Sequence, residues 1–112
     1  MKFITNWLIY TIAIIIAAYL IPGVALPGGI VAALVLAIVL GVINTFIKPI
    51  VQLLALPVTL VTLGIFALIV NALLVMLAAY LVPGVVVASF WAALIFSIVL
   101  ALINAFLSKL AK

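Results

Sequence analysis

The side chains that could carry out chemistry in this 112-residue sequence are few, and nearly all of them are neutral. The sequence has no Asp, Glu, His or Cys, and its four charged residues are the lysines Lys2, Lys48, Lys109 and Lys112. General acid–base catalysis draws mainly on the missing types, and so do metal sites. The composition therefore predicts a protein that is not an enzyme and has no metal, cofactor or disulfide. A net charge of +4 is also too small to indicate a nucleic-acid partner.

The remaining chemistry is hydrogen bonding by amides and hydroxyls. A side-chain amide facing lipid loses its hydrogen bonds at a cost of a few kcal/mol, on the order expected for buried polar groups. We therefore expect these groups to face one another or the backbone freed around a proline. The candidate polar cluster consists of Asn44, Asn71, Asn104, Gln52, Thr59 and Thr62.

The elements that position these residues must be membrane helices. Hydrophobic residues make up 75% of the chain and charged residues 4%, whereas a soluble domain is about one quarter charged. At about 20 residues per crossing, the chain holds four spans. Strands are not expected, because the hydrocarbon region tolerates no open sheet edge. The predicted fold is an all-α integral membrane protein, with residues 1–112 forming one transmembrane domain.

An internal repeat organises these spans. The stretch Ala17–Val24 recurs as Ala78–Val85, and Ile43-Asn44 recurs as Ile103-Asn104. The offset is 61 positions before the first loop and 60 after it. The sequence thus predicts two helical hairpins, over residues 4–48 and 65–110.

Proline and glycine mark the ends of the predicted helices. The expected helices cover residues 4–21, 29–48, 65–82 and 90–110. The first could also be a signal peptide, but its apolar run is long for one and recurs inside the chain. The expected structural breaks are Pro22, Gly23, Pro49, Pro57, Gly64, Pro83 and Gly84.

The segment 49–64 leaves two alternatives open. It could cross the membrane as a fifth span, or it could be a re-entrant segment, broken at Pro57, that returns to the same side. A return places all four lysines on one face, as the positive-inside rule favours. We therefore expect two parallel repeats, related by an axis along the membrane normal, with both termini cytoplasmic.

Small residues share one helical face in each repeat. Ala37 and Gly41 in the second helix correspond to Ser97 and Ala101 in the fourth. Such spacing allows helices to approach closely. We expect a helix-packing seam here and a homo-oligomer, although a polar pathway along the same face is the alternative.

Several stretches resemble a known family. Ile43–Pro49, Leu56–Gly64, Asn71–Leu73 and Tyr80–Gly84 are similar to the YvlD-type branch of the phage-holin-4 superfamily of small bacterial membrane proteins. The resemblance implies a multi-pass protein of the bacterial inner membrane. That family is largely uncharacterised, so no catalytic residue carries over. This sequence also departs from the family pattern, because relatives usually carry acidic residues or arginine in their loops.

Three functions are compatible with these patterns. The first is a structural, self-assembling membrane protein, which the small-residue faces favour. The second is a holin-like pore former. The third is a small transporter or channel with a site at the segment 49–64, because interrupted helices at membrane depth often mark such sites.

Overall fold

The computed structural model describes residues 2–62 and 64–111, and most of them are helical. The prediction of an all-α protein is confirmed, apart from two strands of two residues each. The described elements, in chain order, are α1 (Lys2–Leu20), β1 (Val24–Ala25), α2 (Gly29–Val42), the π-helical turn η1 (Ile43–Ile47), α3 (Lys48–Val61), α4 (Ile65–Leu81), β2 (Val86–Val87) and α5 (Phe90–Leu110).

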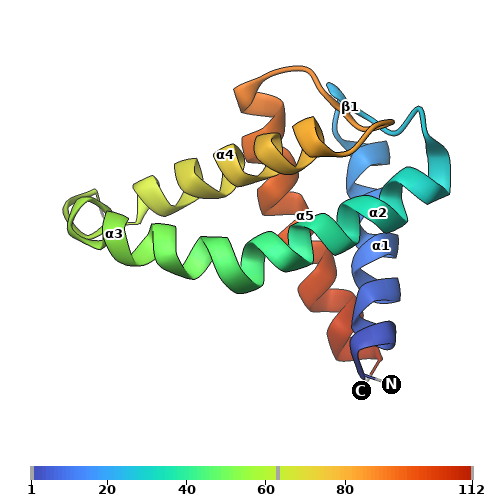
Figure 1. The fold of residues 1–112 in the computed structure, drawn as a ribbon, viewed down its shortest axis with the longest axis horizontal. Helices are drawn as coiled ribbons and strands as arrows, with labels where there is room; N and C mark the ends of the chain where they lie inside the picture. Colours follow the sequence, from blue (N-terminus) through green and yellow to red (C-terminus); the bar gives the residue numbers. More distant parts are fainter. Residues whose placement is uncertain (1, 63, 112) are drawn as a thin grey trace.

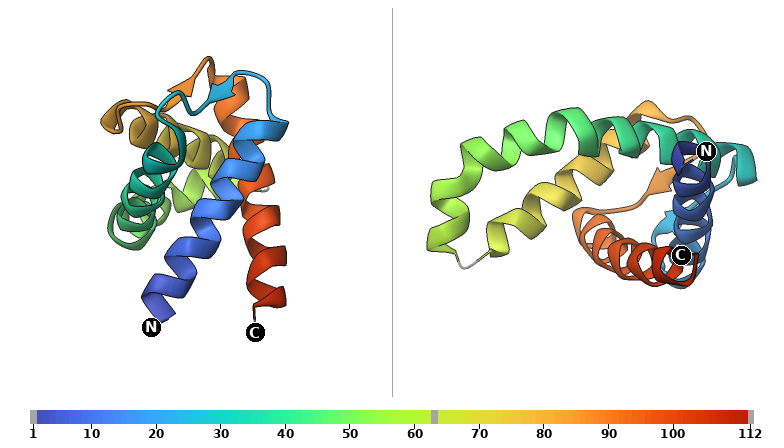
Figure 2. Two further views of the ribbon diagram at one scale, coloured as in Figure 1. Left: turned by 90° about the vertical axis from the view of Figure 1, so that its right-hand side faces the viewer. Right: turned by 90° about the horizontal axis from the view of Figure 1, so that it is seen from below.

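Two pairs of helices cross each other in the fold: one pair is α1 and α5, and the other is the continuous stretch from α2 to α3 together with α4 (Figure 1). α1 and α5 pack against each other, and Figure 2 shows that they diverge toward the start of α1 and the end of α5. α2, η1 and α3 form one rod, and α4 runs back along it; Figure 2 shows this hairpin projecting away from α1 and α5. Close contacts join α1 to α2, α2 to α4, α4 to α5 and α5 to α1. The four therefore form a ring, in which the described parts of α1 and α4, and of α2 and α5, lie diagonally opposite.

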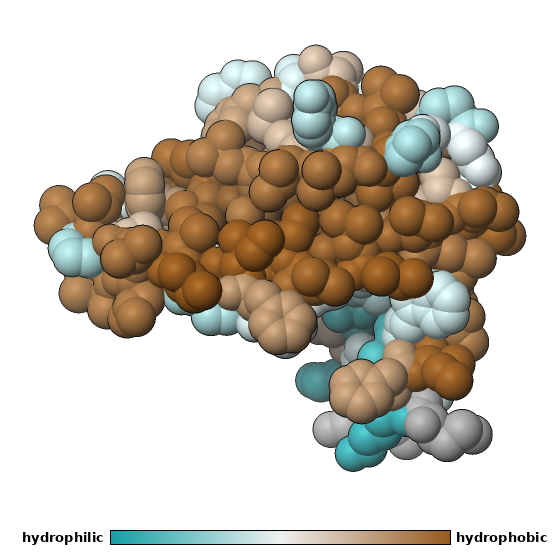
Figure 3. Space-filling view, viewed as in Figure 1, coloured by the Kyte–Doolittle hydropathy of each residue, from teal (hydrophilic) through white to brown (hydrophobic). Residues whose placement is uncertain are grey.

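Small side chains occupy the centre of this ring. Ala13, Ala17, Ala33 and Ala93 are all 0% exposed, which lets the helices approach closely. Most large apolar side chains point outward instead, so the surface is largely hydrophobic (Figure 3). By length and composition, α1, the rod from Gly29 to Val61 and α5 could each cross a membrane, and α4 is a shorter apolar helix. These are the properties of a protein whose solvent is lipid.

The loops of the two repeats meet at one end of the molecule. α1 ends at Leu20 and α4 at Leu81, just before the two Pro–Gly pairs. The strands that follow pair antiparallel, with Val24 opposite Val87 and Ala25 opposite Val86. This pairing joins the two hairpins by main-chain hydrogen bonds.

Two further hydrogen bonds show that the loops are related by an internal two-fold axis. The Gly28 N–H donates to the Gly84 carbonyl at 3.1 Å, and the Ala88 N–H donates to the Gly23 carbonyl at 2.6 Å. Gly23 and Gly84 are repeat equivalents, as are Gly28 and Ala88, at the two offsets found in the sequence. The same bond is thus made twice, once in each direction. We call these two bonds and the β1–β2 pair the loop clasp.

The expected break at Pro49 is wrong. The second helix does not stop at Lys48 but continues through η1 and α3 to Val61, and Pro57 lies inside α3. The π-helical turn explains the continuity: it ends where α3 begins, so Pro49 falls in the first turn of a new helix. There a missing N–H costs little. The segment 49–64 is therefore mostly helix, rather than a loop broken at Pro57.

The chain reverses between Thr62 and Gly64. The Thr62 hydroxyl donates to the Val58 carbonyl at 2.9 Å and accepts the Phe66 N–H at 3.2 Å, so it contacts the end of α3 and the start of α4. Gly64 has φ +93°, a conformation that favours glycine. Its N–H donates to the Thr59 carbonyl at 2.9 Å. Thr59 and Thr62 thus build this corner.

Gly84→Ala should destabilise the protein more than Gly64→Ala. Both glycines have a positive φ, +87° and +93°, so either substitution costs about 1–2 kcal/mol of backbone strain. A Cβ at Gly84 would also lie 2.9 Å from the Gly28 Cα, whereas one at Gly64 meets nothing within 4 Å. The measurement is the thermal unfolding midpoint in detergent. Equal midpoints for the two variants would show that the loop clasp is not tightly packed.

Candidate functional site, a polar chamber between the helices

A cavity of about 240 Å³ lies between the helices of the ring. Polar side chains from α1, η1, α3, α4 and α5 line it, whereas α2 contributes only Leu40. Its walls are otherwise made of apolar side chains, mainly Leu40, Leu74, Val75 and Leu100. We call this cavity the chamber. Its polar lining consists of Tyr10 from α1, Asn44 from η1, Lys48 from α3, Asn71 from α4, and Ser97 and Asn104 from α5.

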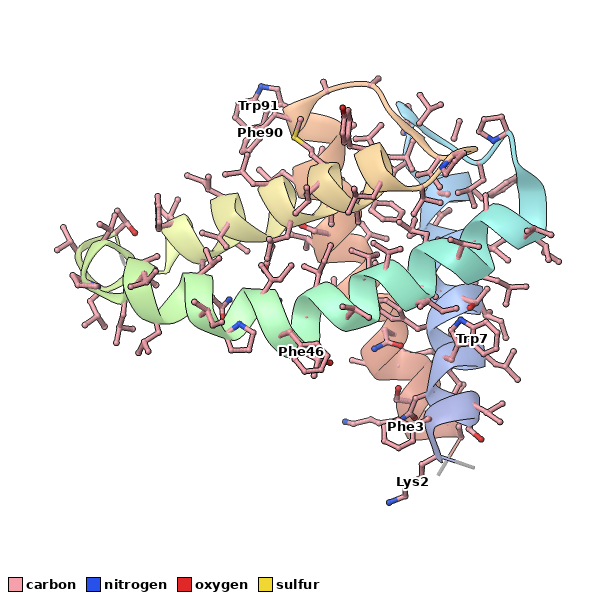
Figure 4. All side chains as sticks on the ribbon, viewed as in Figure 1. Lys2, Phe3, Trp7, Phe46, Phe90 and Trp91 are labelled. Carbon is pink, nitrogen blue, oxygen red and sulfur yellow. The ribbon has the colours of Figure 1, made fainter. Side chains whose placement is uncertain are left out.

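A larger groove of about 750 Å³ lies next to the chamber. The two spaces share Tyr10, Asn44 and Asn104 as lining residues. Figure 4 shows Phe3 on α1 and Phe46 on the underside of the rod, and both line this groove. The groove therefore opens toward the end of the molecule that holds the two chain termini. It lies away from the loop clasp.

The polar groups of the chamber are only partly satisfied by one another. The Asn44 Nδ2 donates to the Tyr10 hydroxyl at a long 3.4 Å. Ser97 donates to the Leu94 carbonyl of its own helix at 2.8 Å. The Asn71 Oδ1 is buried and has no hydrogen-bond partner within the described part of the chain. A buried acceptor left in that state costs about 1–3 kcal/mol, so the chamber favours a molecule that can donate to it.

Some of the residues that line the chamber are repeat equivalents. Asn44 corresponds to Asn104, Tyr10 occupies the position equivalent to Asn71, and Leu40 corresponds to Leu100. Other lining residues have their equivalents in the groove, since Ser97 and Ala101 correspond to Ala37 and Gly41. The chamber is therefore not symmetric with respect to the two repeats.

The structure brings together half of the predicted polar cluster. The asparagines Asn44, Asn71 and Asn104 all line the chamber, but their expected partners Gln52, Thr59 and Thr62 do not. In the corner between α3 and α4, Thr62 takes part through its hydroxyl and Thr59 through its main-chain carbonyl. Gln52 lies half-buried on α3. The sequence interpretation missed the roles of Tyr10 and Lys48. The repeat alignment of Tyr10 with Asn71 was the signal that could have identified Tyr10.

The expected packing seam is not formed within the chain. A Cβ added to Gly41 would meet nothing within 4 Å, and Ala101 is exposed. Ala37 is buried and Ser97 half-buried. The two small-residue faces lie on α2 and α5, which are diagonal members of the ring. They therefore face the chamber and the groove instead of each other.

These features define a small, all-helical integral membrane protein with an internal repeat and a chamber with polar lining between its helices. The chain matches, over residues 1–106, the model of a family described as mycobacterial 4 TMS phage holin, superfamily IV. It belongs to that family. The YvlD resemblance is also confirmed, and the family is one of membrane proteins with four transmembrane segments.

Two relatives are similar but uncharacterised. The uncharacterized protein SCO3922 of Streptomyces coelicolor is 37% identical over 119 residues, covering 91% of this chain and 95% of the relative. The uncharacterized membrane protein YvlD of Bacillus subtilis is 42% identical over 48 residues, covering 43% of this chain and 40% of the relative. No solved structure matches this chain.

Gly41→Leu should be better tolerated than Ala33→Leu. Gly41 lies in a helix with open space beside it, whereas Ala33 is 0% exposed. Inserting bulk into a closed core typically costs about 1–3 kcal/mol. The unfolding midpoint in detergent measures the difference, with Ala93→Leu as the repeat-equivalent second test. If Gly41→Leu is as damaging as Ala33→Leu, the Gly41 face is covered in the folded protein.

Proposed function

We propose that this membrane protein is a small-solute carrier or channel that takes up a polar solute in the chamber. The observation that carries this proposal is a chamber with polar lining at the centre of four apolar helices. Polar groups inside a membrane protein are expensive and typically face one another or a water-filled space. A bundle with a purely structural role would be more stable with apolar side chains at these positions.

The chamber is closed toward the loop clasp. Ile14, Leu36 and Phe96 are at most 1% exposed and lie nearer the loops than the polar residues do along their helices. The groove supplies the opening at the other end. This one-sided access favours a carrier, or a channel with a closed gate, over a permanently open pore.

Our proposal for the membrane orientation places the groove on the cytoplasmic side. Lys2 and Lys109 lie at the end that holds the termini, whereas the loop clasp lies at the other end and contains no lysine. The positive-inside rule then favours cytoplasmic termini in a bacterial inner membrane. Lys112 lies outside the described residues.

Self-assembly is a second candidate, and the groove favours it. Asn44, Thr45 and Phe46 are exposed there, next to the open side of Gly41. Polar side chains facing lipid would be stabilised by a second copy of the chain that covers them. Such an oligomer could be purely structural, or it could enclose a holin-like pore.

Reconstituted liposomes distinguish these functions. We expect glycerol to enter liposomes with the protein faster than empty ones, while trapped carboxyfluorescein is retained. Asn104→Leu removes a chamber amide, and one hydrogen bond of about 1 kcal/mol corresponds to a roughly fivefold slower entry. Thr59→Val, outside the chamber, is the matched control. No glycerol entry above empty liposomes would contradict the carrier, and release of the dye with a defined oligomer would support the pore.

Single cysteines test the orientation, because the chain has none of its own. With an impermeant thiol reagent added to intact cells, the exposed loop positions Pro27→Cys and Ser89→Cys should be labelled. Lys2→Cys and Lys109→Cys should be labelled only after the membrane is opened. Labelling of Ser89→Cys and Lys109→Cys from the same side would reject the proposed orientation.

A further inference from the structure

The chamber holds a positive charge that no acidic side chain of this protein can pair with. Lys48 lines the chamber, whereas Lys2 and Lys109 do not, and the sequence contains no Asp or Glu. A charge in a partly enclosed, apolar setting is costly unless it is paired. A bound anion would supply the partner that the side chains do not.

The groups around Lys48 suit an anion with several oxygen acceptors. Asn44, Asn71 and Asn104 each carry an amide with two N–H donors, and Tyr10 and Ser97 each carry a hydroxyl. Hydrogen bonds from such donors, together with an ammonium group, are the usual means of holding an oxyanion. A metal cation would find amide oxygens here, but it would be repelled by Lys48.

The groove adds a route for such an anion. Its walls are partly apolar, through Phe3, Ile38, Val42 and Phe46, and partly polar, through Asn6 and Ser108. An amphipathic molecule could place its apolar part against the apolar side chains of the groove and its charged part in the chamber. A free anion could enter along the polar side chains.

We infer that the chamber binds a phosphate-type oxyanion, with Lys48 as its counter-charge and the chamber amides and hydroxyls as its hydrogen-bond donors. This inference rests on the proposed role of the chamber as a solute-binding site, and it names the class of ligand. The phosphate could belong to a phospholipid headgroup or be free in solution, and both present the same acceptor oxygens. Asn71 completes the match, since its buried Oδ1 can accept from a hydroxyl of a protonated phosphate or of a glycerol headgroup.

The test measures ligand-dependent unfolding midpoints of the purified protein in a neutral detergent. The probes are inorganic phosphate, a short-chain phosphatidylglycerol, and a short-chain diacylglycerol that lacks phosphate. Ligands that bind only the folded state raise the midpoint. We expect a rise with phosphatidylglycerol, with inorganic phosphate, or with both, and none with diacylglycerol. A rise with only one of the two probes identifies the source of the phosphate.

Lys48→Gln is the decisive variant, and Lys109→Gln is its matched control. Loss of a charge-assisted hydrogen bond should weaken apparent binding by roughly tenfold or more for Lys48→Gln. Lys109→Gln removes an exposed lysine outside the chamber, so its binding should be unchanged. Lys48→Arg should retain binding, and Asn104→Leu should weaken it, which keeps the test usable if Lys48→Gln folds poorly.

Three outcomes would overturn the inference. They are equal binding by Lys48→Gln and Lys109→Gln, equal stabilisation by diacylglycerol and phosphatidylglycerol, and no stabilisation by either phosphate probe. The proposed transport is judged separately, by glycerol entry into liposomes. Glycerol entry without phosphate binding would support the proposed carrier function and contradict the proposed oxyanion binding. Phosphate binding without glycerol entry would support the oxyanion binding and contradict the carrier function.

Discussion

The two hydrogen bonds of the loop clasp impose the constraint on which the rest of the fold depends. Main-chain groups outside helices need hydrogen-bond partners where they are shielded from water, and each loop here provides them for the other. The Gly28 N–H reaches the Gly84 carbonyl, and the Ala88 N–H reaches the Gly23 carbonyl. Only backbones that approach this closely can make such bonds, which requires glycine at the crossing point. The clasp thereby holds the loop between α1 and α2 against the loop between α4 and α5.

A space between the helices is a consequence of the ring. Each helix packs against two neighbours, so the helices that lie diagonally opposite are separated by a space. The size of the side chains in that space decides whether it is filled or left as a cavity. Near the loops, Ala33, Ala93 and Phe96 fill it. Toward the termini the helices carry Tyr10 and asparagines instead, and a chamber of about 240 Å³ results. The clasp therefore positions the polar residues, although it contacts none of them.

Much of this arrangement could be predicted from the sequence, but the helix partners could not. The repeat and the Pro–Gly pairs located the hairpins, and α5 begins and ends where the pattern indicated, at residues 90 and 110. The sequence analysis expected Asn44, Asn71 and Asn104 to face one another, and all three line the chamber. Pro49 was misleading because the sequence does not reveal a π-helical turn, which allows a helix to restart at a proline. The small-residue faces were misleading because spacing shows which residues share a face and does not show which helix lies opposite.

The two-fold axis relates backbones more closely than side chains, and this difference shapes the chamber. Tyr10 stands where the second repeat has Asn71, and Lys48 stands where it has Ser108. A strictly symmetric chamber would carry two lysines, which would repel each other in an apolar setting, or none. Because one repeat supplies one lysine and both repeats supply amides, the chamber has a single positive charge surrounded by hydrogen-bond donors. Divergence of the repeats thus makes the lining of the chamber asymmetric, as the proposed binding of a single oxyanion requires.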